Sequence, residues 1–162
     1  MKFKVAGKIK TSTVNGEGIR YSLFLQGCKH ACDGCHSPHT WKLSEGEPIE
    51  VVDIFTEMWK TRRYIDGVTI SGGEPFLQPK PLLVLLKLMG AMDVNVWVWS
   101  GYKLEYLLEH FPEHMEHITT IIDGKFEKDN PTKKYWRGSD NQKRYDQVDK
   151  KWVINEKWDI SK

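Results

Sequence analysis

The sequence predicts an α/β protein built as an open, partial barrel of about five or six mostly parallel strands. Short apolar segments alternate with longer amphipathic ones, as in proteins whose parallel strands are joined by right-handed helical crossovers. The chain has 162 residues, whereas a complete barrel of this kind needs at least about 200. Motif-like segments follow several predicted strands, and ligands of such folds lie at the carboxyl ends of the strands.

The first half of the chain alternates predicted strands and helices. A strand near residues 3–9 is followed by a second at 22–27, an apolar run that ends in glycine. Residues 49–60 have apolar side chains at helical spacing, which predicts a helix. Residues 67–73 are β-branched and bounded by glycines, which predicts a strand. Residues 79–92 begin with prolines, which a first helical turn tolerates, and continue as a strongly apolar helix.

The second half continues the alternation and then changes character. Residues 94–99 and 118–122 are predicted strands, and residues 103–111 are the helix between them. From 123 to 150 the chain is polar and rich in turn residues, so we expect loops there. A last short strand is expected at 152–154.

Composition favours one globular domain. Apolar residues make up 40% and charged residues 28% of the chain, and neither a repeat nor a linker divides it, so we expect a single domain spanning 1–162. A formal net charge of +2 gives no reason to expect nucleic acid as a partner. No apolar run resembles a membrane span or a signal peptide, so we expect no membrane partner and a cytoplasmic protein with reduced thiols.

The three cysteines, Cys28, Cys32 and Cys35, form one C-x3-C-x2-C loop directly after the second predicted strand. A disulfide framework would use pairs spread along the chain, so clustered thiols indicate metal ligands. A [4Fe–4S] cluster usually takes four thiolates. Three cysteines would leave one iron open, and an open position is a property of catalytic metal sites.

Structural zinc is the alternative, with His30, His36 or His39 as a fourth ligand. Zinc sites more often use two separated ligand pairs, and this chain has no second pair of cysteines. We therefore favour the iron–sulfur interpretation. A histidine beside a ligand cysteine, such as His36, is more often a neighbouring loop residue than a ligand.

Residues 71–75, SGGEP, follow the next predicted strand. Gly72 and Gly73 expose backbone groups to a ligand, and the Glu74 carboxylate suits a ligand that carries an ammonium group. An ordinary strand-to-loop turn would have the same residues.

Two other strand ends are weaker candidates. Ser100 follows the strand that contains Trp97 and Trp99, whose rings we expect to be packing residues. Asp123 begins DGKF, which also fits a simple turn.

The cysteine loop after an early strand resembles the radical S-adenosylmethionine superfamily. The resemblance implies that the three cysteines hold a [4Fe–4S] cluster and are catalytic, and that S-adenosyl-L-methionine ligates the fourth iron through its amino and carboxylate groups. Reductive cleavage of this cofactor would give a 5′-deoxyadenosyl radical. The implied cofactor-binding residues are Gly34, Cys35, His36, Gly72, Gly73, Glu74 and Ser100.

Three further segments narrow the resemblance: Arg20 to Cys28, HSPHTW at 36–41, and DGKF with WRGSDNQ at 136–142. Together they resemble the activating proteins of anaerobic ribonucleotide reductases. The resemblance implies that the radical abstracts hydrogen from a glycine of the large reductase subunit, with an electron donor such as flavodoxin. An activase of another glycyl-radical enzyme and a zinc-binding interaction module are the alternatives. WRGSDNQ is either a docking loop for the partner or a segment packed on its own domain.

Overall fold

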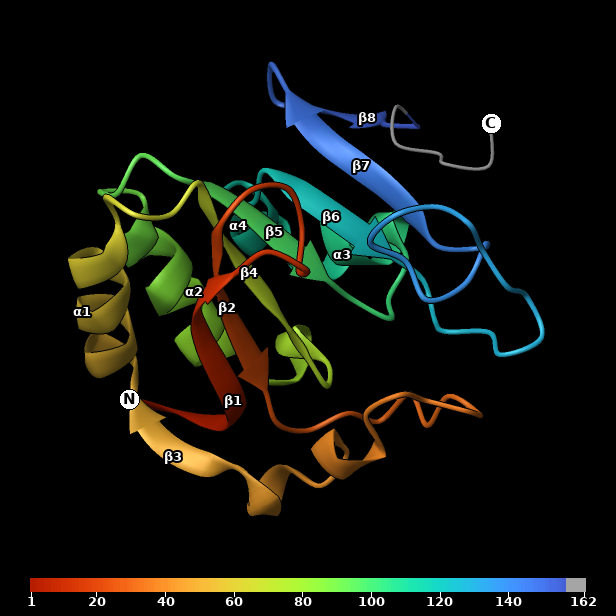
Figure 1. Ribbon diagram of the computed structural model, residues 1–162, viewed down its shortest axis with the longest axis horizontal. Coiled ribbons are helices and arrows are strands. Elements are labelled where there is room, and N and C mark those ends of the chain that lie inside the picture. The colour runs from red at the N-terminus through yellow and green to blue at the C-terminus, as the bar shows by residue number, and fades with distance from the viewer. Residues whose placement is uncertain (157–162) are drawn as a thin grey trace.

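The computed structural model describes residues 1–156, and these form one sheet of eight strands in the order β3-β1-β2-β4-β5-β6-β7-β8 (Figure 1). The strands are β1 Lys2–Ser12, β2 Arg20–Leu25, β3 Glu47–Glu50, β4 Gly67–Gly72, β5 Asn95–Trp99, β6 Thr120–Asp123, β7 Lys143–Val148 and β8 Lys151–Ile154. The central strands β2, β4, β5 and β6 are parallel, and antiparallel pairs flank them on both sides. The α/β class is confirmed, with a mixed sheet of more strands than expected.

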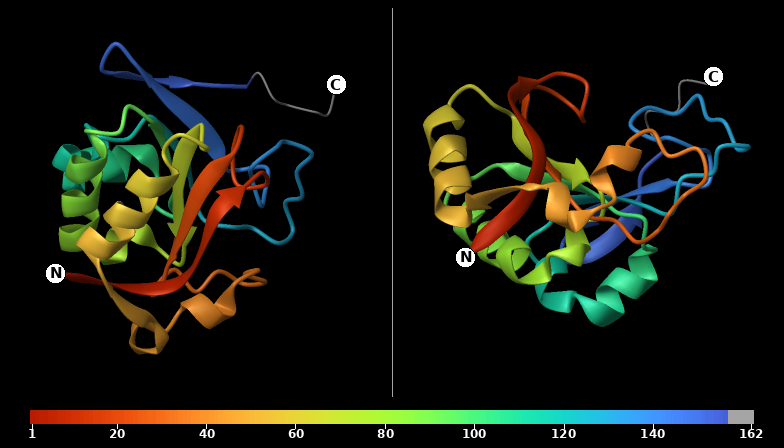
Figure 2. Two further views of the ribbon diagram at one scale, coloured as in Figure 1. Left: turned by 60° about the vertical axis from the view of Figure 1, so that its left-hand side comes forward. Right: turned by 90° about the horizontal axis from the view of Figure 1, so that it is seen from below.

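The helices lie together on one side of the sheet (Figure 2). They are α1 Val51–Thr61, α2 Pro79–Met89, α3 Leu104–His110 and the single turn α4 Pro112–Met115. The central strands turn alternate apolar side chains toward these helices, because successive residues of a strand point to opposite faces. The fully buried residues on that face include Tyr21, Leu23, Leu25, Val68, Ile70, Val98 and Ile121.

The opposite face of the sheet, which we call the polar face, contains Arg20, Thr69, Trp97, Thr120 and Arg144. The Arg20 Nε–H donates to Thr69 Oγ1 at 2.8 Å, and both arginines lie over the Trp97 ring, at 4.9 and 4.4 Å from its centroid. This face has polar and aromatic groups where the other face has the aliphatic core.

The aliphatic core includes no buried residue between Leu25 and Val51, the interval that contains the cysteine loop.

Two expectations about secondary structure are wrong. The interval 123–150 is polar and rich in turn residues, which predicts loops, but Lys143–Val148 within it is β7. Its sequence is polar because Arg144 and Asp146 take part in hydrogen bonds rather than in the aliphatic core. The helix expected from residue 49 begins at Val51, since residues 47–50 pair with β1 as β3.

Within residues 1–156 no helix has the length and apolar character needed to cross a lipid bilayer.

Candidate active site

The cysteine loop leaves the carboxyl end of β2 and is closed at its base by two backbone hydrogen bonds. The Gly27 N–H donates to the Thr40 carbonyl at 2.6 Å, and the Cys28 N–H donates to the Trp41 carbonyl at 3.0 Å. Ala31 and Gly34 have positive φ, of 51° and 72°, so the chain turns sharply between the cysteines. The loop is thereby a compact unit attached to the sheet at one end.

All three thiols are free, half-buried and on the wall of one pocket of about 260 Å³. Burial raises the pKa of the Cys28 thiol above its ordinary value, so binding a metal there releases a proton. Within residues 1–156, no three or more His, Cys, Asp or Glu side chains are arranged around a single metal ion. Three thiols on one open wall, with no fourth cysteine in the sequence, fit a cluster with one iron left for a ligand.

The ends of β4 and β5 form the other wall of this pocket, and they include Gly72, Gly73, Ser100 and Gly101. Gly72 has φ +106°, and a side chain there would meet the backbone of Leu25. A side chain on Gly73 would meet the Gly27 carbonyl. The two glycines thus allow the end of β4 to lie directly against the start of the cysteine loop.

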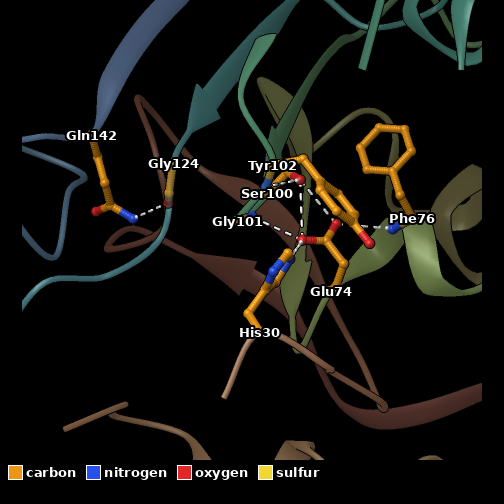
Figure 3. A network of polar contacts seen from close by, with 8 residues as sticks. All are labelled: His30, Glu74, Phe76, Ser100, Gly101, Tyr102, Gly124 and Gln142. Atoms are coloured by element: carbon orange, nitrogen blue, oxygen red, sulfur yellow. Dashed lines mark hydrogen bonds and ion pairs between the residues drawn. The ribbon is translucent and has the colours of Figure 1, made fainter. Parts of the chain in front are cut away.

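Glu74 lies behind the pocket wall, and its side chain is 2% exposed. Figure 3 shows its carboxylate facing His30, Ser100 and Gly101, and these three residues line the pocket whereas Glu74 does not. Its oxygens accept hydrogen bonds from these three residues and from the Phe76 N–H. These four contacts within the protein are the ones that the structure shows for this carboxylate, and its expected contact with a ligand ammonium group stays a prediction.

The remaining predicted residues divide between the pocket and its surroundings. His36 lines the pocket and lies edge-on to Phe126, with 4.8 Å between the ring centroids. Gly34 is exposed and packs against Lys128 outside the pocket. Asp123 is buried and accepts the Leu104 N–H at the start of α3 at 2.8 Å, while burial raises the pKa of its carboxyl group.

Sequence reasoning did not select two polar residues of this site, His30 and Gln142. The Gln142 side chain accepts the Gly138 N–H at 2.7 Å and donates to the Gly124 carbonyl at 2.9 Å, and it lines the pocket (Figure 3). The signal that could have indicated Gln142 is its place as the last residue of WRGSDNQ. His30 was considered solely as a zinc ligand, and nothing in the loop sequence indicates that its ring reaches Glu74.

A second cavity, of about 430 Å³, adjoins the first and shares Ser71 and Trp99 with it. Thr69 of the polar face is among its lining residues, and exposed Val14 and Tyr135 lie at its edge. Trp136 also lines it, and its carbonyl accepts the Trp99 indole N–H at 2.6 Å. WRGSDNQ therefore packs on its own sheet and borders both cavities.

The β7 end of the polar face is organised around Asp146. Burial opposes ionisation of this carboxyl group, but hydrogen bonds from Asn155, Thr120 and Arg144 outweigh burial and hold its pKa below the ordinary value. Arg144 also forms an ion pair with Glu17 at 2.9 Å. These contacts connect β7 with the loop that precedes β2.

Comparison with known proteins gives three consistent results. The family model described as a 4Fe-4S single cluster domain matches residues 14–145. The anaerobic ribonucleoside-triphosphate reductase-activating protein of Enterobacteria phage T4 is 37% identical over 147 residues, which cover 86% of this chain and 91% of the relative. The protein of the same name from Haemophilus influenzae is 39% identical over 142 residues, or 82% of this chain and 90% of that one.

Among solved structures, QueE from Escherichia coli superposes with a TM-score of 0.52 at 16% sequence identity. The match covers 78% of this chain and 73% of QueE. At this identity the likeness concerns the fold.

Proposed function

Because the chain belongs to the family of anaerobic ribonucleoside-triphosphate reductase-activating proteins, we propose that it generates the glycyl radical of an anaerobic ribonucleotide reductase. The protein is a radical S-adenosylmethionine enzyme. Its [4Fe–4S] cluster supplies the electron that cleaves S-adenosyl-L-methionine, and the resulting 5′-deoxyadenosyl radical takes a hydrogen atom from a glycine of the large reductase subunit.

Cys28, Cys32 and Cys35 hold the cluster in this proposal. The observation that carries it is that three free thiols from one loop share a pocket with the glycine-rich ends of two parallel strands. Gly72 and Gly73 present backbone groups to the cofactor, beside Ser100 on the neighbouring strand. His36 and Cys35 lie on the opposite wall, and Gly34 and Glu74 support the site from outside the pocket.

The protein substrate enters through the second cavity in this proposal. A segment that occupies this cavity reaches the cluster pocket at Ser71 and Trp99, which border both. Val14 and Tyr135 at its edge offer apolar contact to a partner, with exposed fractions of 74% and 49%. The cavity opens to solvent, as a macromolecular substrate requires.

The proposal also covers the domain organisation, the cellular location and the partners of the protein. Residues 1–162 act as one radical S-adenosylmethionine domain, in which β2, β4, β5 and β6 are the parallel strands of an open partial barrel. The protein works in the cytoplasm without nucleic acid or membrane partners, and an electron donor such as flavodoxin reduces the cluster. Activation of a different glycyl-radical enzyme is the competing function, and WRGSDNQ favours the ribonucleotide reductase.

The test is an anaerobic reaction of the reconstituted protein with dithionite, S-adenosyl-L-methionine and the large reductase subunit. We expect stoichiometric iron and labile sulfide, release of 5′-deoxyadenosine and methionine, and a glycyl-radical signal in the electron paramagnetic resonance spectrum. Cofactor cleavage without a glycyl radical on that subunit would refute the activase assignment. Zinc in place of iron and sulfide would refute the radical chemistry itself.

A further inference from the structure

We propose that His30 is a positioning residue whose hydrogen bond to Glu74 fixes the cysteine loop relative to the strand ends that receive the cofactor. The inference rests on the proposed function, because it assumes that the loop holds the cluster. In this inference His30 and Glu74 work as a pair, and Glu74 is the group through which His30 acts.

The contact is short and enclosed. His30 Nε2 lies 2.7 Å from Glu74 Oε2, and the two side chains are 8% and 2% exposed. The other groups in contact with this carboxylate, Phe76 N–H, Ser100 Oγ–H and Gly101 N–H, are donors, so we assign the hydrogen of this contact to His30 Nε2. Charge-assisted hydrogen bonds of this kind are about twice as strong as neutral ones.

Glu74 connects three separate segments of the chain. Its carboxylate accepts the Ser100 hydroxyl at 2.9 Å and the Gly101 N–H at 2.8 Å, both at the end of β5. It accepts the Phe76 N–H at 3.1 Å, within its own turn after β4. His30 is the fourth donor and comes from between Cys28 and Cys32. The carboxylate thus joins the ends of β4 and β5 to the middle of the cysteine loop (Figure 3).

Packing around the imidazole supports this geometry. The ring lies edge-on to Tyr102, with 4.6 Å between centroids and an interplanar angle of 74°. A side chain on Gly101 would come within 2.6 Å of His30 Nε2, so this glycine permits the ring to approach β5. The base of the loop also contacts the end of β4, where the Glu74 N–H donates to the Gly27 carbonyl at 2.8 Å. Farther along the loop, Asp33 forms an ion pair with Lys128, after β6, at 2.7 Å, and His36 packs on Phe126. These last two contacts do not reach the strands that form the opposite wall of the pocket.

The chemistry of the network allows no amide in place of the carboxylate. All four partners are donors, so a Glu74→Gln side chain would direct its NH2 group at the N–H of Phe76 or Gly101 in either orientation. A cofactor that binds both the cluster and the strand ends requires these two walls at a fixed separation. Loss of the His30 contact therefore weakens cofactor binding without removing any cluster ligand.

The experiment compares wild type with His30→Ala, His30→Gln and Glu74→Gln, and with His39→Ala as the matched control. His39 is an exposed histidine of the same loop. The measurements are iron and sulfide content, the dissociation constant of S-adenosyl-L-methionine, and the electron paramagnetic resonance spectrum of the reduced cluster with and without that cofactor. Thermal unfolding of each metal-free protein checks the fold.

We expect His30→Ala to bind a full cluster and to bind the cofactor about tenfold more weakly, the loss typical of a hydrogen bond to a charged group. Its spectrum should respond less to the cofactor. His30→Gln keeps an N–H donor and should recover part of the affinity, while His39→Ala should match wild type. In the double variant the loss should be smaller than the sum of the losses in His30→Ala and Glu74→Gln, because both changes act on the contact between these two side chains.

Wild-type cofactor affinity in folded, cluster-loaded His30→Ala would overturn the inference, as would equal losses in His30→Ala and His30→Gln. If His30→Ala does not fold, the comparison of His30→Gln with Glu74→Gln decides, and equal defects in these two would also overturn it. Wild-type protein that fails to bind the cluster or the cofactor would instead refute the proposed function.

Discussion

Replacement of Gly73 by alanine tests whether this glycine serves the close approach of two backbones. The new Cβ would lie 2.9 Å from the Gly27 carbonyl carbon, where ordinary contacts begin at 3.4 Å, so this carbonyl must move by at least 0.5 Å. The Glu74 N–H donates to the same carbonyl at 2.8 Å, and Cys28 is the next residue. Overpacking of this kind costs about 1–3 kcal/mol, which corresponds to a Tm lower by about 2–12 °C in a chain of this length.

The assay is thermal unfolding of the metal-free protein together with the dissociation constant of S-adenosyl-L-methionine for the reconstituted one. Gly7→Ala is the control, because the nearest atom to its Cβ would be Phe24 Cδ2 at 4.0 Å. Alanine is favoured over glycine inside a strand by about 0.5–1 kcal/mol, so the control should have an unchanged or higher Tm. If Gly73→Ala also keeps its Tm and its cofactor affinity, the steric reasoning is wrong.

Three other predictions concern the metal, the acid stability and the partner. Single alanine variants of the cysteines should lose iron and labile sulfide and yet unfold within a few degrees of metal-free wild type, because these half-buried thiols lie outside the core; a collapse in Tm would contradict this. Asp146→Asn should have a lower free energy of unfolding in urea than wild type at pH 7. Because the pKa of Asp146 is lowered in the folded protein, its contribution to stability is lost on protonation, so the difference between the two proteins should shrink below about pH 3.8; an unchanged difference at pH 3 would contradict this reasoning. Trp136→Ala should lower both Tm and cofactor cleavage, because the Trp136 ring lies edge-on to Trp97 of the sheet; a lower glycyl-radical yield with normal Tm and normal cleavage would contradict this and indicate docking.

The sequence allowed the fold class and the strand ends to be predicted where apolar periodicity was strong. Residues 67–73 and 79–92 correspond closely to β4 and α2, because their side chains form the aliphatic core. Lys143–Val148 was missed because most of its own side chains are polar, and periodicity of apolar residues detects no such strand. The contact of His30 with Glu74 joins residues 44 positions apart, so it depends on the pairing of β2 with β4, which a local pattern does not contain.

The separation of the cysteine loop from the aliphatic core has a consequence for how the protein is matured and repaired. The hydrophobic core contains no buried residue between Leu25 and Val51, so we expect the polypeptide to reach its folded form before any iron binds. Cluster delivery is then the last step of maturation and acts on a finished scaffold with an accessible pocket. By the same reasoning, oxygen that destroys the cluster should leave the scaffold folded, and we expect that existing molecules can be reloaded under anaerobic conditions.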